Sequence, residues 1–257
     1  MLMEKIDRRR HYILVVDTET ANTLQQGNKL DMSSVLPYDI GWAVIDTHGT
    51  FYEKRSYVNR DIFVFERKLM RSAYYAEKIP KYIAEIRSGQ RIMASTYEIR
   101  QAMLSDIEAY GIKEVAAHNA RFDYTALGNI QKWTTKSKYR YFLPFGIEWW
   151  DTMKMVRSVI CKMPTYRKFC EENGYLTPTG QLRVTAEILW RFISKDNEFE
   201  EAHTGLEDVE IEAQILAYCY RQHKKMEKRL WRDVKEFSAP TAFQRQLLRS
   251  IKDCPVI

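Results

Sequence analysis

The sequence has few of the features that mark secreted, membrane-spanning or low-complexity proteins. No apolar run approaches the ~18 residues that a membrane-spanning helix needs, and the charged residues 1–12 contain no apolar core of a signal peptide. The few cysteines form no Cys-x-x-Cys pair, which argues against a zinc site or a disulfide framework. We therefore expect reduced thiols in a cytoplasmic protein without a membrane partner. The cysteines are Cys161, Cys170, Cys219 and Cys254.

The composition is that of an ordinary globular protein with a basic surface. The 257 residues show no compositional bias and no internal repeat, and 45% of them are hydrophobic, so they can bury a normal core. The net charge of +6 favours a polyanionic partner such as nucleic acid. Sixteen tyrosines and six tryptophans supply rings for base stacking, although most are expected in the core.

The stretch at residues 13–20 combines a buried strand with two acidic side chains. Four consecutive apolar residues at 13–16 indicate a strand covered on both faces. Side chains alternate along a strand, so Asp17 and Glu19 should point to the same side. Two adjacent carboxylates repel each other unless a cation lies between them, and a divalent metal is the usual one. A solvated turn at the end of the strand is the alternative.

Strand and helix patterns predict an α/β protein with a mixed five-stranded sheet flanked by helices. The short turn at 46–49 favours an antiparallel pair of strands. The predicted strands cover 13–20, 38–45, 51–58, 114–117 and 146–150. After a helix that starts near Arg121, the predicted helices cover about 152–160, 164–173, 184–194, 206–227 and 239–251.

Residues 61–110 interrupt this pattern and predict a helical insertion. Helical spacing is seen in two sets of apolar residues, with a Ser-, Gly- and Arg-rich connector at 86–95 between them. The two sets are Phe65, Leu69, Ala73 and Ala76, and Ile99, Met103, Ile107 and Tyr110.

Further acids and histidines stand before predicted helices. One group, His-Asn-Ala-Arg-Phe-Asp at 118–123, lies at a strand-to-helix junction, where open α/β sheets bind ligands. Another, His-Thr-Gly-Leu-Glu-Asp at 203–208, leads into a helix. Asp208 heads an apolar helix stripe, so its carboxylate should point inward and need a partner or a metal. His203 lies on a glycine-bearing loop, and its near-neutral pKa suits a general base. Asp151 is more simply a helix N-cap than a metal ligand.

These motifs, in this order, resemble the DEDDh exonucleases of the ribonuclease-H-like superfamily. Proofreading exonuclease subunits, ribonuclease T and oligoribonuclease belong to that family. The matching motifs are Asp-x-Glu at 17–19, His-Asn-x-x-Phe-Asp at 118–123 and His-x-x-x-x-Asp at 203–208. The histidine variant is indicated because His203 lies five residues before Asp208, and position 204, where the tyrosine variant carries its tyrosine, is threonine. The resemblance covers roughly residues 10–225.

The resemblance implies 3′-to-5′ hydrolysis of phosphodiester bonds with release of nucleoside 5′-monophosphates. Two Mg²⁺ or Mn²⁺ ions ~3.5–4 Å apart would activate water and stabilise the leaving oxygen, and hard ions prefer carboxylate ligands. His203 would be the general base, with a helix-capping histidine as the alternative. Structural ion pairs are the alternative for the acids. The implied metal ligands are Asp17, Glu19, Asp123 and Asp208.

Substrate contacts are expected on three segments. Thr18 and Thr20 would place backbone groups beside the terminal nucleotide, as the same motif positions do in the family, and Asn119 would touch the substrate. The run at 132–141 combines cations with aromatic rings, which is how single strands are held without sequence reading; an ordinary solvated loop is the alternative. Within this run the expected contacts are Lys132, Trp133, Lys136 and Lys138. The basic stretch 221–235 is more simply a solvated helix face.

We thus predict an exonuclease domain at 1–230, with the insertion at about 61–110, and a helical extension at 231–257. The apolar residues at 247–251 either fold back on the domain or dock a protein partner. The leading prediction is a two-metal 3′-5′ exonuclease acting mainly on single-stranded DNA. The alternatives are an RNA-trimming enzyme and a catalytically silent nucleic-acid-binding or polymerase-associated module, because a fold does not by itself imply activity.

Overall fold

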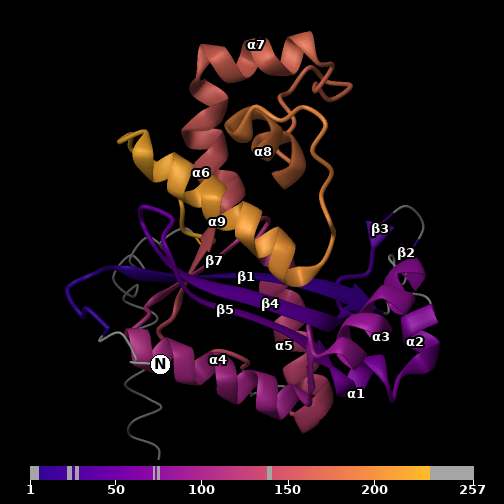
Figure 1. Ribbon diagram of the computed structural model, residues 1–257. Coiled ribbons are helices and arrows are strands. Elements are labelled where there is room, and N and C mark those ends of the chain that lie inside the picture. Colours follow the sequence, from indigo (N-terminus) through magenta and orange to yellow (C-terminus); the bar gives the residue numbers. More distant parts are fainter. Residues whose placement is uncertain are drawn as a thin grey trace, which may run out of the picture.

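A computed structural model describes residues 6–21, 25–26, 29–71, 73, 76–137 and 141–231. Its centre is a six-stranded sheet in the order β6-β5-β4-β1-β7-β8 (Figure 1). The strands are β1 (Tyr12–Ala21), β4 (Leu36–Asp46), β5 (Phe51–Asn59), β6 (Ile92–Ala94), β7 (Glu114–Ala117) and β8 (Glu148–Asp151), and a separate hairpin joins β2 (Gln25–Gln26) to β3 (Lys29–Leu30).

Within the large sheet, β4 runs antiparallel to both of its neighbours, β1 and β5, and the remaining pairs are parallel. The predicted mixed sheet is confirmed, and it has one strand more than the five expected. The additional strand, β6, lies at the edge beside β5. It comes from the segment 86–95, which we had expected to be a connector.

Helices cover both faces of the sheet (Figure 1). The described helices are α1 (Arg60–Phe63), α2 (Arg67–Arg71), α3 (Ile79–Ser88), α4 (Thr96–Tyr110), α5 (Arg121–Thr135), α6 (Thr152–Ser158), α7 (Pro164–Glu172), α8 (Ala186–Ser194) and α9 (Gly205–Arg221), with 3₁₀ turns η1 (Ala76–Lys78) and η2 (Ile160–Lys162).

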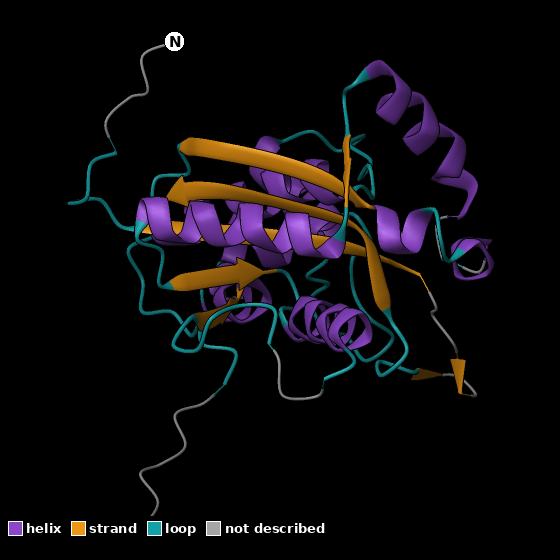
Figure 2. Cartoon of the chain, turned by 90° about the horizontal axis from the view of Figure 1, so that it is seen from below, coloured by secondary structure: helices purple, strands orange, loops and turns teal. Residues whose placement is uncertain are grey.

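The alternation of β1 divides the core into two layers. Leu14 and Val16 pack on the side of α1–α5, as part of one cluster of buried side chains. Ile13 and Val15 pack on the opposite side, in a second cluster with residues of α6–α9. Seen from below, α4 lies in front of the sheet and runs along its strands (Figure 2). A strand with apolar side chains on both faces, as the sequence predicted, is what a sheet covered on two sides requires.

The insertion at 61–110 is more broken than its helical spacing suggested. The first predicted helix is two short helices, α1 and α2, followed by η1 and α3. The second is the single helix α4, which Ser95 and Glu98 cap reciprocally and which ends at Gly111 in the left-handed conformation. Asp151 is the N-cap of α6, as predicted, because its Oδ1 accepts a hydrogen bond from the Met153 amide at 3.0 Å.

The predicted helix at 239–251 and the extension at 231–257 fall outside the described residues, apart from Trp231. Within the described ranges, no helix is both long and apolar enough to cross a membrane.

Candidate active site

The end of β1 presents Asp17 and Glu19 on the face that α9 covers. Both follow Ile13 and Val15 at steps of two, and those side chains belong to the core layer of α6–α9. The pairing of β1 with β4 stays regular through Glu19 and shifts by a bulge between Glu19 and Thr20. Both carboxylates therefore project from the same face of the strand, as predicted.

Two glycines allow the start of α9 to lie directly on β4, next to these acids. Gly41 is the β4 partner of Asp17. A Cβ added to Gly41 would lie 2.3 Å from the carbonyl carbon of Gly205, the first residue of α9. No side chain fits in that space. Gly205, two residues after His203, therefore allows α9 to pack closely on β4. This contact brings Asp208, in the first turn of α9, to the end of β1.

Glu19, His203 and Asp208 form a group that could hold a metal ion. One ligand atom from each residue lies within 4.8 Å of the other two. The Oδ1 atom of Asp208 is buried and has no hydrogen-bond partner. A buried carboxylate oxygen without a donor is costly, and a divalent cation bound by oxygen ligands would satisfy it. The donor set therefore fits a hard metal ion.

Asp123 reaches the site from the first turn of α5, and its carboxylate is 1% exposed. The Thr18 hydroxyl of β1 donates a hydrogen bond of 2.8 Å to Asp123 Oδ1. Just before the helix, Asn119 turns the chain with a φ of 65°, a conformation that asparagine tolerates. The tight turn between β7 and α5 thus delivers Asp123 to the neighbouring strand β1.

Two acids that the motifs did not identify lie beside these. Glu212, one turn after Asp208 on α9, is buried and accepts a hydrogen bond of 3.0 Å from the His118 amide. Glu201 lies on the loop before α9, with Oε2 3.7 Å from His203 Nδ1. Glu212 shares the apolar face of α9 with Asp208, so the pattern that pointed to Asp208 also applied to it. We call Asp17, Glu19, Asp123, Asp208 and Glu212 the β1 acid group.

The β1 acid group holds its protons unusually tightly. Burial raises the pKa of Glu19 to about 9, and the charge of Asp208 adds to this effect. Burial likewise raises the pKa of Asp208 to about 8 and that of Asp123 to about 7. Burial also raises the pKa of Asp17 well above its usual value, and the charge of Glu212 is the next cause. Such clustered and shifted carboxylates are typical of functional sites.

Lys78 of the insertion holds the loop that carries His203. Its ammonium group donates to the carbonyl oxygens of Ala202 at 2.6 Å and His203 at 3.3 Å. His203 itself has a φ of 49°, which is uncommon for a residue other than glycine. Burial lowers the pKa of its imidazole, and the charge of Lys78 lowers it further. A neutral histidine at the edge of the acid group is what a general base requires.

A second set of acids, which includes Asp39 on the neighbouring strand β4, binds the side chain of Arg91. Arg91 is buried and binds Asp39 Oδ2 of β4 through Nη1 at 3.1 Å and both carboxylate oxygens of Glu207 through Nη2 at 3.1 Å. Asp39 Oδ2 also accepts hydrogen bonds from the Tyr82 hydroxyl at 2.7 Å and the Gly205 amide at 3.0 Å. We call Asp39, Glu85, Glu207, Tyr82 and Arg91 the Arg91 cluster.

The remaining predicted site residues differ in their hydrogen bonds and in their exposure to solvent. His118 is held by Thr152 and by the Val184 carbonyl, at 2.8 and 2.6 Å, which indicates a structural role. Thr20 is buried, and Asn119 and Lys132 are exposed. Trp133 packs at the edge of the core with Lys136 Nζ 4.8 Å from its ring centroid. Lys138 lies outside the described residues.

Solved structures of exonucleases share this fold at low sequence identity. A 3′-exonuclease described in specific recognition of the 3′ end of histone mRNA stem-loop is 16% identical with a TM-score of 0.50, over 88% of this chain and 68% of that one. Exonuclease I from Methylocaldum szegediense is also 16% identical, with a TM-score of 0.52, over 83% of this chain and 41% of that one. A product-bound exonuclease I gives a TM-score of 0.50 at 14% identity, over 84% and 44%.

By sequence, no protein-family model matches this chain, and no curated protein matches it. The likeness shows the fold, the predicted mixed sheet flanked by helices. The chain spans less than half the length of the exonuclease I structures.

Proposed function

We propose that this protein is a metal-dependent 3′-5′ exonuclease that hydrolyses nucleic acid to nucleoside 5′-monophosphates. The observation that carries the proposal is the clustering of acids from β1, α5 and α9, with Glu19 and Asp208 beside His203, the pKa values of the carboxylates raised and that of His203 lowered. The fold shared with exonucleases supports the same reaction class.

Asp17, Glu19, Asp123 and Asp208 would hold two Mg²⁺ or Mn²⁺ ions. When bound, such ions supply charge that activates a water molecule and stabilises the leaving oxygen. Among the described residues, no Lys or Arg forms an ion pair with these four acids. Lys78 acts on Glu19 and Asp208 only as a more distant charge that lowers their pKa values. The four carboxylates are thus available to an external cation.

His203 would accept the proton of the attacking water. The hydroxide then forms a bond to the phosphorus of the terminal nucleotide, the bond from phosphorus to the 3′ oxygen of the preceding nucleotide breaks, and that oxygen takes up a proton. Glu201, 3.7 Å from Nδ1, would orient the imidazole and stabilise its positive charge after proton transfer. Lys78 fixes the backbone at His203 and so limits the positions that the ring can take.

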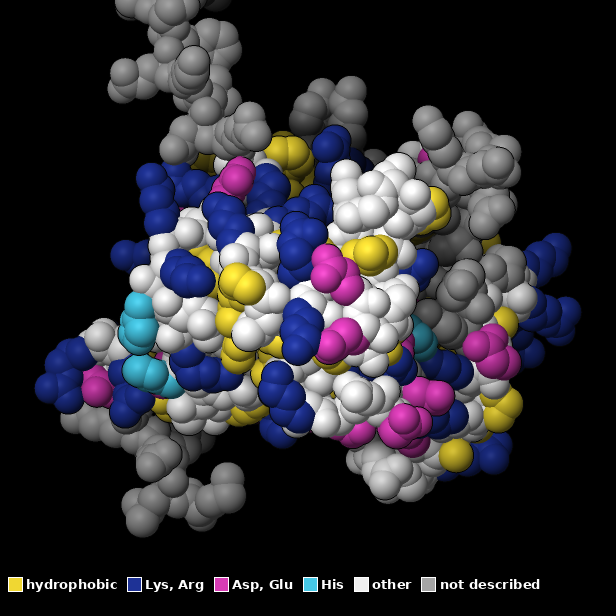
Figure 3. Space-filling model, turned by 90° about the horizontal axis from the view of Figure 1, so that it is seen from above, with side chains coloured by type: hydrophobic (Ala, Val, Ile, Leu, Met, Phe, Trp, Pro, Cys, Tyr) yellow, Lys and Arg dark blue, Asp and Glu magenta, His cyan; other side chains and the backbone are white. Residues whose placement is uncertain are grey.

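Single-stranded DNA is the first choice of substrate, and RNA is the second candidate. Lys and Arg side chains are spread over the face seen in Figure 3, in line with the net charge of +6 and a polyanionic partner. RNA is favoured by one observation, the structural likeness to a 3′-exonuclease described with histone mRNA. Thr18, Thr20 and Asn119 would lie near the terminal nucleotide, with the Thr18 side chain committed to orienting Asp123.

The test uses 5′-labelled single-stranded DNA and RNA of one sequence, with Mg²⁺, Mn²⁺ or EDTA. Wild type is compared with Asp17→Ala and His203→Ala, and with Tyr97→Ala as a control for an exposed side chain on α4. We expect a ladder that shortens from the 3′ end, which EDTA and the two site variants abolish and the control leaves intact. Binding without shortening in either metal would contradict the proposal and favour a silent binding module.

A further inference from the structure

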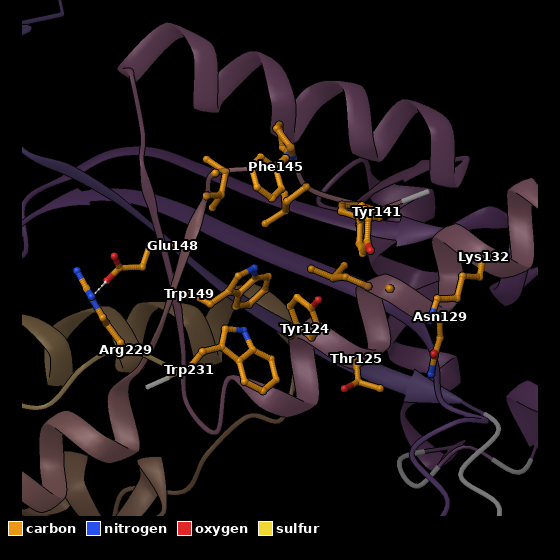
Figure 4. A pocket seen from close by; sticks show the side chains of 17 residues that line it. Tyr124, Thr125, Asn129, Lys132, Tyr141, Phe145, Glu148, Trp149, Arg229 and Trp231 are labelled. Atoms are coloured by element: carbon orange, nitrogen blue, oxygen red, sulfur yellow. Dashed lines mark hydrogen bonds and ion pairs between the residues drawn. The ribbon is translucent and has the colours of Figure 1, made fainter. Parts of the chain in front are cut away.

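A groove of about 730 Å³ lies between α5 and the segment that leads into β8 (Figure 4). These two parts of the chain form its walls, and core side chains such as Leu127 and Trp149 also line it. Arg229 and Trp231, which follow α9, close one end. None of the catalytic residues proposed above lines this groove.

Aromatic rings dominate the lining. Tyr124 of α5 lies edge-on to Trp149 and to Trp231, with ring centroids 5.5 and 5.6 Å apart. Tyr141 and Phe145 project from the opposite wall (Figure 4). Of seven large hydrophobic side chains that are exposed in the described part of the chain, three line this groove: Tyr141, Phe145 and Trp231. Exposed rings gathered in one place mark a binding surface.

Positive charge accompanies the rings. Lys132 lines the groove about two turns along α5 from Thr125, and Arg229 lines the other end, where it also binds Glu148 at 3.0 Å. The Arg121 guanidinium lies 5.7 Å from the Trp231 ring centroid. Rings flanked by cations are the arrangement that holds single-stranded nucleic acid, with bases on the rings and phosphates at the cations.

The groove begins next to the candidate active site on α5. Asp123 of the site and Tyr124 of the groove are consecutive residues in the first turn of this helix. From Arg121 to Lys132 the helix advances about 16 Å, which is roughly four or five nucleotides at 3.4 Å each. A strand whose 3′ end lies at Asp123 can therefore continue into the groove.

We infer that this groove binds the single-stranded part of the substrate upstream of the scissile bond. This inference rests on the proposed exonuclease function, because it places the 3′ end at the β1 acid group. The cations and the link to Asp123 favour nucleic acid over an apolar protein segment, which would need neither. The bases stack on Tyr141, Phe145 and Trp231, and Lys132 and Arg121 neutralise the phosphates.

The test measures binding separately from cleavage. Fluorescently labelled single strands of 12 nucleotides are titrated with protein in EDTA, where no hydrolysis is expected, and anisotropy is recorded. The variant Tyr141→Ala/Phe145→Ala is compared with the control Tyr97→Ala, which removes an equally exposed ring on α4. Loss of stacking at one base raises Kd about fivefold or more, so we expect at least this change for the groove variant and none for the control.

Cleavage of a trinucleotide in Mg²⁺ provides the second measurement. This substrate is too short to fill the groove, so the groove variant should lose less of its cleavage rate on the trinucleotide than on the 12-nucleotide strand. Equal Kd values for the 12-nucleotide strand in wild type and groove variant would overturn the inference, even where cleavage is normal. If the groove variant binds more weakly than wild type but wild type cleaves nothing, the proposed exonuclease function is overturned instead.

Discussion

The β1 acid group and the Arg91 cluster place buried carboxylates on neighbouring strands, and they differ in how the charge is compensated. In the Arg91 cluster a buried guanidinium binds three acids, and a tyrosine hydroxyl and a backbone amide also donate to Asp39 Oδ2. In the β1 acid group the described residues supply hydrogen bonds from Thr18 and from the His118 amide but no ion pair. Burial raises the pKa of acids in both sets. At Asp39 the charge of Arg91 opposes this rise, whereas at Asp17 the charges of the neighbouring acids add to it.

This difference separates a structural function from a chemical one. Taking a charge out of water costs several kcal/mol unless a partner offsets it. The Arg91 cluster offsets the cost within the chain and holds the start of α9 through Glu207 and Gly205. For the β1 acid group we propose that an external cation offsets the cost. The predictions below test this contrast, from the largest expected effect to the smallest.

Asp17→Asn should have the largest effect on activity. Even the outer partners of a metal site cost ~10–100-fold when removed, so loss of a ligand should lower the hydrolysis rate by more than about 100-fold. The amide removes one of several repelling charges, so the melting temperature in EDTA should not fall. Hydrolysis rates and thermal unfolding of the same preparation check both expectations, and activity within tenfold of wild type would refute the ligand role of Asp17.

Arg91→Met should have the largest effect on stability. It leaves the Asp39 charge buried without its cation, which costs about 3–5 kcal/mol of unfolding free energy. Lys81→Met is the matched control because Lys81 pairs with Glu85 and Glu207 from a half-exposed position, at 3.7 and 3.9 Å. Such surface pairs contribute about 0–1 kcal/mol. Denaturant titration of both variants measures the difference, and equal losses would contradict the buried role of Arg91.

Gly41→Ala should separate α9 from β4. The new Cβ would meet backbone atoms of Gly205 at 2.3 Å, so α9 must shift, at a cost of about 1–3 kcal/mol. Nuclease activity should fall with it, because Asp208 moves away from Glu19. Gly128→Ala in α5, where the Cβ meets nothing within 4 Å, is the control and should unfold no more easily than wild type. An unchanged activity in Gly41→Ala would show that the close contact does not position Asp208.

Lys78→Met should have a smaller effect, of about tenfold on activity, because the loop at His203 loses two hydrogen bonds and shifts slightly. The lysine charge lowers the pKa of His203, so its removal raises that pKa. A general base works only when neutral, and the acidic limb of the pH–rate profile should therefore move to higher pH. A profile that keeps its position would argue against His203 as the titrating base.

The sequence predicted most acids of the β1 acid group, but not all of the buried acids in the two sets. Asp17, Glu19, Asp123, His203 and Asp208 stand in local motifs at strand or helix ends, where spacing alone fixes their direction. Glu212 was not predicted, although it lies on the same apolar face of α9 as Asp208, one turn later. Asp39 was also missed, although it is an acid inside the otherwise apolar strand β4.

The partners of these acids could not be predicted because they come from distant segments. Lys78 meets residue 202 and Arg91 meets Glu207 across more than a hundred residues. Strand β6 was missed because three residues beside the Ser-Gly-rich end of α3 carry no periodic pattern, and pairing with β5 alone makes them a strand. The separation into two helix layers followed directly from the alternation along β1.

The most direct test of the central claim is the effect of Mg²⁺ on thermal stability at two pH values. The pKa values of the β1 acid group are raised in the folded protein, to about 7 for Asp123, 8 for Asp208 and 9 for Glu19, so the folded state binds more protons than the unfolded state. The stability that these groups contribute is present below their unfolded pKa values near 4 and is lost as the pH rises through 7–9.

Mg²⁺ binds the ionised carboxylates and replaces these protons. We predict that Mg²⁺ raises the melting temperature more at pH 8.5 than at pH 6, and that Asp17→Asn removes most of this gain while Lys81→Met keeps it. A melting temperature that Mg²⁺ leaves unchanged at both pH values, or raises equally in wild type and Asp17→Asn, would contradict the claim that the β1 acid group is a metal site.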